Sequence, residues 1–217
     1  MKKIAALILS LFLAGTVYAK EAYSGDFKLT GGLGFGGLVL REGDFGQEYT
    51  STGFDIGLST THLFDLNSTM SLGFSCQLDF SFGGADEYQR ILSTGQWMSQ
   101  HCGSGFTMEM LLGPTFAVKC GEVVIFSGTL GFAYNVVSVM NEDRTSSMTF
   151  IAPGVGFDIN AKFVPNKNVS PVVGYTMCFG FPSGGYNEKG LYWAFDQPSA
   201  SFTNITGTFY AGVSWNW

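Results

Sequence analysis

Apolar and polar residues alternate along much of this chain with a period of two. In residues 70–82, Met, Leu, Phe or Cys occupies every even position, and Ser, Gly, Gln or Asp every odd position. This is the period of a β-strand with one apolar face, and no helical period fits it. The pattern therefore predicts eight strands, which are residues 70–82 and residues 27–39, 53–64, 106–118, 123–136, 150–163, 169–181 and 202–217. Val123 and Ile125 break the pattern, because they fall on the inner, polar face.

Short and long connections alternate between these segments. The short ones are residues 65–68, 119–122 and 164–168, and the long ones are residues 41–52, 83–105, 138–149 and 182–201. Ten residues at ~3.3 Å each and a ~45° tilt suffice to cross the ~25 Å apolar band of a membrane barrel. Alternation of periplasmic turns with longer external loops is typical of such barrels. We therefore predict an all-β fold, an eight-stranded antiparallel transmembrane β-barrel.

Composition favours a membrane barrel over a soluble one. Charged residues make up 13% of the chain, well below the roughly 25% usual in soluble domains, and aromatic residues reach 16%. A soluble sandwich or lipocalin-like barrel would point its apolar face inward and cover its outer face with charge. Here the second face consists mainly of Gly, Ser and Thr, which suits a narrow lumen better than a solvated exterior.

The start of the chain has the features of a secretory signal peptide. Two lysines precede an apolar run at residues 4–15, and residues 17–19 form a small-x-small cleavage site. The run is shorter than the ~20 residues that a membrane-spanning helix needs. We expect residues 1–19 to be removed and residues 20–217 to form one barrel domain in the outer membrane of a diderm bacterium.

The last segment resembles the signal by which outer-membrane barrels are recognised for assembly. Four residues carry the likeness, Tyr210, Gly212, Trp215 and Trp217, although Tyr210 stands where the signal usually has a polar residue. Apolar side chains on alternate positions suit a final strand whose outer face meets lipid. The resemblance implies the barrel-assembly machinery as a partner, and outer-membrane lipid as the surroundings.

The inner face carries charges that differ along the barrel. Asp55, Asp79 and Glu109 lie on three consecutive segments, toward the expected external end. Such an acidic cluster could attract cations, or its carboxylates could be satisfied by hydroxyl groups, Asn204 and water. Eight strands leave an interior just wide enough for side chains to fill, which favours a hydrogen-bonded core.

The sequence gives little support for a catalytic site, a metal site or a surface that binds nucleic acid. Neither of the two histidines is placed beside a hydroxyl with a third orienting group: His62 faces outward, and His101 adjoins Cys102 in an expected loop. We expect no enzyme activity, no cofactor and no metal site. The sequence allows a disulfide between Cys102 and Cys178 if the loop that carries Cys102 folds over the external mouth of the barrel. Without Lys2 and Lys3 the net charge of −6 becomes −8, unlike the basic surface that nucleic acid needs.

Large aromatic side chains gather in two of the expected external loops. Candidates for contact with a partner are Tyr88, Trp97, Tyr186, Tyr192, Trp193 and Phe195. Exposed aromatic residues can anchor a protein or glycan, but they can equally pack the loop into a cap or sit at the lipid headgroups.

With eight strands, four external loops and the terminal aromatic signal, residues 25–217 resemble small outer-membrane proteins of the outer-membrane-protein A, X and W type. The Phe-, Gly- and Ser-rich strands also resemble short barrels of spirochaetes such as treponemes. These resemblances imply adhesins, structural anchors or conduits. We expect a role in surface interaction, adhesion or envelope structure, through loops that meet a host or envelope partner. The alternative is a narrow channel or conduit for small apolar solutes or cations.

Overall fold

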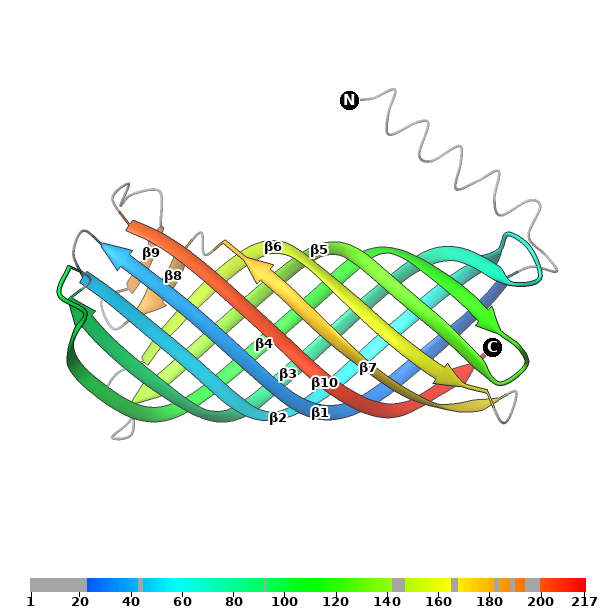
Figure 1. The fold of residues 1–217 in the computed structure, drawn as a ribbon, viewed down its shortest axis with the longest axis horizontal. Coiled ribbons are helices and arrows are strands. Elements are labelled where there is room, and N and C mark those ends of the chain that lie inside the picture. The colour runs from blue at the N-terminus through cyan, green and yellow to red at the C-terminus, as the bar shows by residue number, and fades with distance from the viewer. Residues whose placement is uncertain are drawn as a thin grey trace, which may run out of the picture.

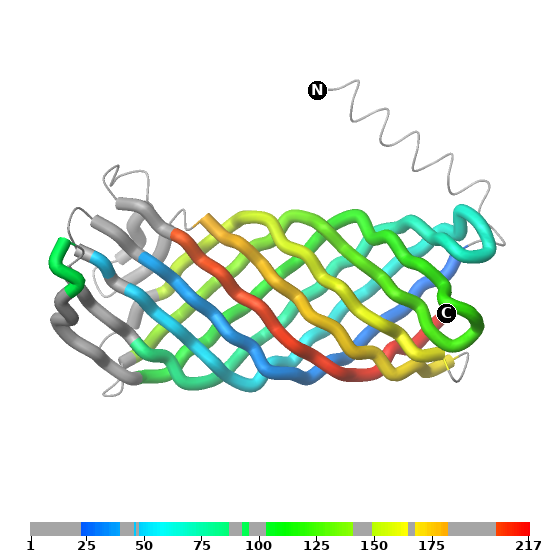
Figure 2. Tube along the Cα trace, in the orientation of Figure 1, coloured from blue at the N-terminus to red at the C-terminus, as the bar shows by residue number. Residues whose placement is uncertain are grey.

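The computed structural model describes residues 23–42, 45–91, 93–141, 147–164, 168–181, 184–187, 190–193 and 200–217 (Figure 1). Figure 2 traces the Cα atoms in the same orientation and also draws in grey the strand residues whose side chains are not described. Within these residues the chain is almost entirely β-strand. The strands are β1 (Tyr23–Glu42), β2 (Phe45–Asp65), β3 (Met70–Ile91), β4 (Gln96–Cys120), β5 (Val124–Asn141), β6 (Ser147–Phe163), β7 (Val169–Gly180), β8 (Gly184–Asn187), β9 (Gly190–Trp193) and β10 (Ala200–Asn216). No helix in the described ranges is both long and apolar enough to cross a membrane.

Eight of these strands close into an antiparallel barrel. They follow one another in the order β5-β4-β3-β2-β1-β10-β7-β6, and pairing of β5 with β6 completes the circle (Figure 1). The short strands β8 and β9 form a separate hairpin that pairs with β6 at Thr149–Ile151. The predicted fold, an eight-stranded transmembrane β-barrel, is confirmed.

The strands are staggered as they pass around the barrel. A path of paired residues leaves β1 at Lys28 and crosses every other barrel strand once, through Ser59, Gln77, Leu111, Ala133, Gly154, Gly180 and Asn204. It returns to β1 at Leu38, ten residues beyond its start. The path therefore shifts by ten residues of ~3.3 Å along the strands while it crosses eight strand spacings of ~4.8 Å. This shift corresponds to a tilt of the strands of about 40° from the barrel axis. The inclined strands of Figure 1 have this geometry.

The alternating pattern places its two faces as predicted. Polar residues such as Asp55, Thr176 and Asn204 are buried inside, whereas Leu33, on the outer face, is 71% exposed. Outward apolar side chains from all eight barrel strands form a ring that we call the apolar belt; it includes Leu29, Leu33, Phe54, Ile56, Leu58, Leu72, Phe82, Phe116, Phe126, Leu130, Phe132, Val155, Ile159, Val173, Phe179, Phe209 and Trp215. Such a ring suits hydrocarbon surroundings and not water.

One inner position was predicted wrongly. Val123 is not an inward strand residue, because β5 begins only at Val124 and Val123 lies 62% exposed in the turn before it. Gly121, in the same turn, has a φ of 68°, a left-handed conformation that glycine adopts without strain. The tight turn explains why Val123 leaves the alternating face.

The two ends of the barrel differ. At the turn end lie Tyr23, Trp217, the short connections at residues 66–69 and 121–123, the end of β6 and the start of β7, close to where the turns were expected. At the opposite, hairpin end the expected loops are wrong in extent, since most of residues 41–52, 83–105 and 138–149 continue the strands. Beyond the belt the outer face carries exposed hydroxyls at Thr50, Thr52, Ser104 and Thr203. The alternation of apolar and polar residues therefore ends there, although the strands remain paired through their backbones.

Candidate functional site

The interior of the barrel is filled by side chains in three layers. Along β6 the layers are represented in turn by Phe150, Asp158 and Lys162, from the hairpin end to the turn end. All three side chains are buried. The interior therefore changes from apolar, through acidic, to ion-paired along its length.

The layer at the turn end is an ion-pair network. The Lys162 ammonium donates to the Asp26 carboxylate at 2.6 Å and to the Asn216 side chain at 2.9 Å. Nearer the rim, the Lys119 ammonium lies 2.9 Å from the Asp65 carboxylate. Asp26, Lys119, Lys162 and Asn216 line a small pocket of about 220 Å³. Both lysines are thus held by carboxylates from other strands, which ties β1 to β6 and β2 to β4.

The middle layer brings together the three acidic residues predicted from the sequence. Asp55, Asp79 and Glu109 are all buried, and the charges of Asp79 and Glu109 interact with those of the other acids. Asp158 on β6, a fourth inward acidic residue, joins them, since its charge acts on both Asp79 and Glu109. The stagger of the strands contributes to this grouping, because each crossing of the sheet also climbs toward the hairpin end.

The four carboxylates are unequally satisfied. Asp158 accepts three hydrogen bonds, and Glu109 accepts two, from the Thr206 hydroxyl and from the Cys178 thiol at 3.1 Å. Asp55 accepts hydrogen bonds from Ser81, at 2.7 Å, and from Thr208, and Asp79 accepts one from Gln77 at 2.6 Å. The Oδ1 atoms of Asp55 and Asp79 have no partner within the described part of the chain.

The described residues include no group of three His, Cys, Asp or Glu side chains arranged to hold a metal ion. The hydrogen bonds of the four carboxylates make the middle layer a hydrogen-bonded core of the kind that fills small barrels. A cation-holding role for Asp55, Asp79 and Glu109 stays a prediction.

An apolar plug lies in the lumen above the acids. Asn135 first bridges Asn204 and Thr206 at 2.9 and 3.1 Å, and above these amides lie six buried residues, Leu38, Tyr49, Ala85, Val137, Val139 and Phe150. The rings of Tyr49 and Phe150 pack with their centroids 5.9 Å apart. Sequence reasoning missed this plug. Its signal was the change of inward residues on β5, from Thr129 and Asn135 to Val137 and Val139.

Cys178 and His62 lie on opposite faces of the barrel wall. Cys178 is fully buried as a free thiol, so the Cys102–Cys178 disulfide is not formed. His62 faces outward at the turn end, where its ring accepts or donates a hydrogen bond with the Tyr23 hydroxyl and packs edge-on to Trp217. The absence of enzyme activity stays an expectation.

Five of the six aromatic contact candidates belong to two hairpins at the hairpin end. The backbone of Tyr88 and Trp97 belongs to β3 and β4, and that of Tyr186, Tyr192 and Trp193 to β8 and β9. The side chains of these five residues, and all of Phe195, lie outside the described residues. Their role stays a prediction.

The predicted assembly residues end the last barrel strand. Tyr210 points inward and donates a 2.6 Å hydrogen bond to Asp158, whereas Trp215 and Trp217 are exposed on the outer face. Gly212 lies against β1, where a Cβ would meet the Leu29 carbonyl oxygen at 2.1 Å. Only the two tryptophans are therefore accessible from outside the folded barrel.

Comparison with protein-family models found no match, and neither did comparison with curated proteins. Solved structures are similar in fold. The outer membrane protein OprG from Pseudomonas aeruginosa is 10% identical, over 89% of this chain and 96% of that one, with a TM-score of 0.51. A major outer membrane protein from Thermus thermophilus is 15% identical, over 89% and 99%, also with a TM-score of 0.51.

The chain has the fold of the small outer-membrane β-barrels. At these identities the likeness concerns the fold alone, so the role has to be argued from the molecule itself. The expected resemblance to small outer-membrane proteins is confirmed at this level, while the resemblance to spirochaete barrels stays untested.

Proposed function

We propose that this protein is an integral barrel of a bacterial outer membrane, with a closed interior and a working surface at its hairpin end. It serves surface interaction, adhesion or envelope structure rather than catalysis. The apolar belt supports a place in lipid, and the fold supports the outer membrane as that place. Short turns and Trp217 then face the periplasm, and the hairpins face outward.

The observation that carries this proposal is the apolar plug over the acidic layer. A path for ions or small solutes would have to pass Leu38, Tyr49 and Phe150, whose packed side chains are buried inside the barrel. Stripping water from an ion beside such side chains is strongly unfavourable. If the lumen is closed, contact with a partner has to take place on the outer surface of the barrel.

The hairpin end offers such a surface because the strands continue beyond the belt. Exposed hydroxyls at Thr50, Thr52, Ser104 and Thr203 surround this extension, and the β3–β4 and β8–β9 hairpins bring the predicted aromatic residues to it. Strand-borne residues are held more firmly than residues on long loops. A rigid rim with hydroxyl and aromatic groups suits contact with a host or envelope partner.

Flux through liposomes tests the proposal. The chain is refolded into liposomes, folding is verified by heat-dependent gel mobility, and release of potassium and of a small sugar is followed. We expect no flux above that of empty liposomes. A Leu38→Ala, Phe150→Ala double variant, which thins the plug, serves as the matched positive control. Flux through the unaltered protein would contradict a closed lumen.

A conduit for cations or small solutes is the second candidate. The unpartnered Oδ1 atoms of Asp55 and Asp79 favour it, because they leave acceptor capacity inside the lumen. If cations enter, replacing both residues by Asn should abolish flux. If the lumen is closed, the same variant should be as tight as the unaltered barrel.

A further inference from the structure

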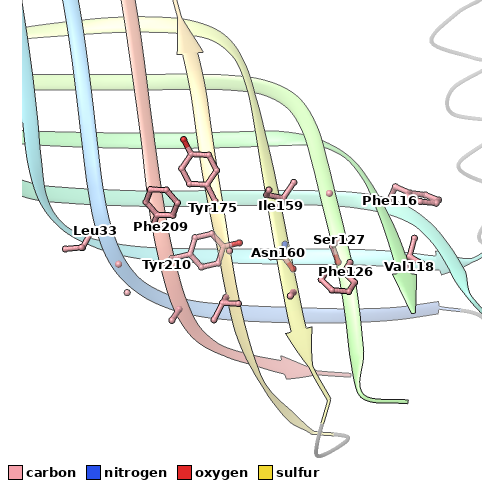
Figure 3. A pocket seen from close by; sticks show the side chains of 17 residues that line it. Leu33, Phe116, Val118, Phe126, Ser127, Ile159, Asn160, Tyr175, Phe209 and Tyr210 are labelled. Atoms are coloured by element: carbon pink, nitrogen blue, oxygen red, sulfur yellow. The ribbon is translucent and has the colours of Figure 1, made fainter. Parts of the chain in front are cut away.

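The outer surface of the barrel has a large groove within the apolar belt. It measures about 870 Å³, within the range of roughly 300–1,000 Å³ usual for small-molecule sites. Leu33, Phe209, Tyr175, Ile159 and Phe126 follow one another along it on five neighbouring strands, β1, β10, β7, β6 and β5 (Figure 3). Phe116 and Val118 on β4 extend it to a sixth strand. The groove therefore wraps around the barrel wall instead of opening into the lumen.

The floor of the groove consists of small outward residues, Gly31, Gly128, Ala161 and Ala211. Barrel packing does not require a glycine at Gly128, since a Cβ there would meet only the Asp158 carbonyl oxygen, at 4.0 Å. At Gly31 the nearest atom would be 3.6 Å away, an ordinary contact. Inward glycines differ, because a Cβ at Gly174 would lie 2.4 Å from the Tyr210 ring. Larger outward side chains would fit, so the hollow is not a by-product of closing the barrel.

One wall of the groove is made rigid by aromatic packing. The rings of Tyr175 and Phe209 lie 4.4 Å apart between centroids, and Phe35 and Phe157 pack against Tyr175 at 6.4 and 6.1 Å. Side chains held in this way lose little freedom when a ligand arrives. The groove is thus preformed on this side.

The place of the groove decides the chemistry of its occupant. It is continuous with the belt, which faces lipid hydrocarbon, and its side-chain walls are apolar. A second barrel would touch the convex wall along only a few strands, so it could not follow a groove across six. A flexible hydrocarbon chain can follow the groove along its whole length. We infer that the groove holds an acyl chain of a membrane phospholipid as a fixed, slowly exchanging ligand.

Electron paramagnetic resonance of a phosphatidylcholine with a nitroxide near the end of one acyl chain tests this inference. The measured quantity is the number of motionally restricted chains per refolded barrel. Gly128→Leu fills the floor and should lower that number. Cys76→Leu changes an outward residue of β3, on a part of the belt that does not line the groove, and should leave the number unchanged. Gly31→Leu is the second filling variant if Gly128→Leu does not fold.

Three outcomes would overturn the inference. An equal number of restricted chains in Gly128→Leu and the unaltered protein means that the groove binds none. Restriction of a spin-labelled fatty acid but not of the phospholipid means a different ligand. Detergent-resistant dimers that disappear in Gly128→Leu mean that a second copy covers the groove. The inference rests on the membrane location in the proposed function, but none of these outcomes depends on whether the lumen conducts.

Discussion

The indole ring of Trp217 occupies the space that a side chain at Gly25 would need. A Cβ at Gly25 would lie 2.3 Å from the indole Nε1 atom. The two residues also exchange backbone hydrogen bonds, at 3.2 Å from the Gly25 amide and 3.0 Å from the Trp217 amide. The ring of His62 on β2 packs edge-on against the same indole. Trp217 thereby covers the seam where the last strand meets the first.

A side chain at Gly25 should weaken this closure. We expect Gly25→Val to lower the free energy of unfolding by about 1–3 kcal/mol, because the indole must move away from β1. Urea titration of the refolded protein, followed by heat-dependent gel mobility, measures the change. Gly37→Val is the matched control on the same strand, since the nearest atom to its Cβ would be 3.9 Å away. Equal stability of the two variants would show that Trp217 adapts without cost.

The buried pair of Lys162 and Asp26 should behave as a unit. Removing one partner leaves a buried charge without compensation, so Lys162→Met alone should destabilise the barrel by about 3–5 kcal/mol. Asp26→Leu combined with Lys162→Met removes both charges and should recover a large part of that loss. A double-mutant cycle from unfolding in urea measures the coupling. Additive effects of the two single changes would mean that the 2.6 Å contact contributes no coupling.

The faces of the strands follow from the sequence, but the layers inside do not. The period of two places Asp55, Asp79 and Glu109 in the lumen, because neighbouring side chains on a strand point to opposite sides. It does not contain the stagger between strands, so it does not settle whether Asp158 lies at the height of the other three acids. The plug was missed for a related reason: Tyr49, Ala85 and Val139 lie on segments expected to be loops, where the outer face no longer alternates.

Asp79 and Asp158 should respond differently to the same substitution. Asp158 accepts hydrogen bonds from Thr176, Asn160 and Tyr210, at 3.0, 2.6 and 2.6 Å. An amide has only one acceptor oxygen, so Asp158→Asn should leave a buried donor unsatisfied and lose about 1–3 kcal/mol.

Asp79→Asn keeps its shape and removes a charge that lies near three other carboxylates. It should be neutral or stabilising, because like charges disfavour one another. Urea midpoints of the two variants provide the comparison. Destabilisation of Asp79→Asn as large as that of Asp158→Asn would show that Asp79 is satisfied by groups other than Gln77.

Deletion of residues 186–195 tests whether the β8–β9 hairpin contributes to partner binding without being needed for folding of the barrel. The deletion removes most of the β8–β9 hairpin, which pairs with β6 only at Thr149–Ile151, and leaves the ladder of the eight barrel strands intact. We expect a folded, heat-modifiable barrel whose binding to host cells or envelope components is reduced. Adhesion of vesicles that carry the unaltered or the shortened protein measures this.

The matched control replaces the same residues by a Gly/Ser linker of equal length, which keeps the spacing between β7 and β10 but removes the aromatic side chains. Loss of folding with both variants would mean that the hairpin caps the barrel. Loss of binding with both, with folding retained, would assign the contact to Tyr186, Tyr192, Trp193 and Phe195.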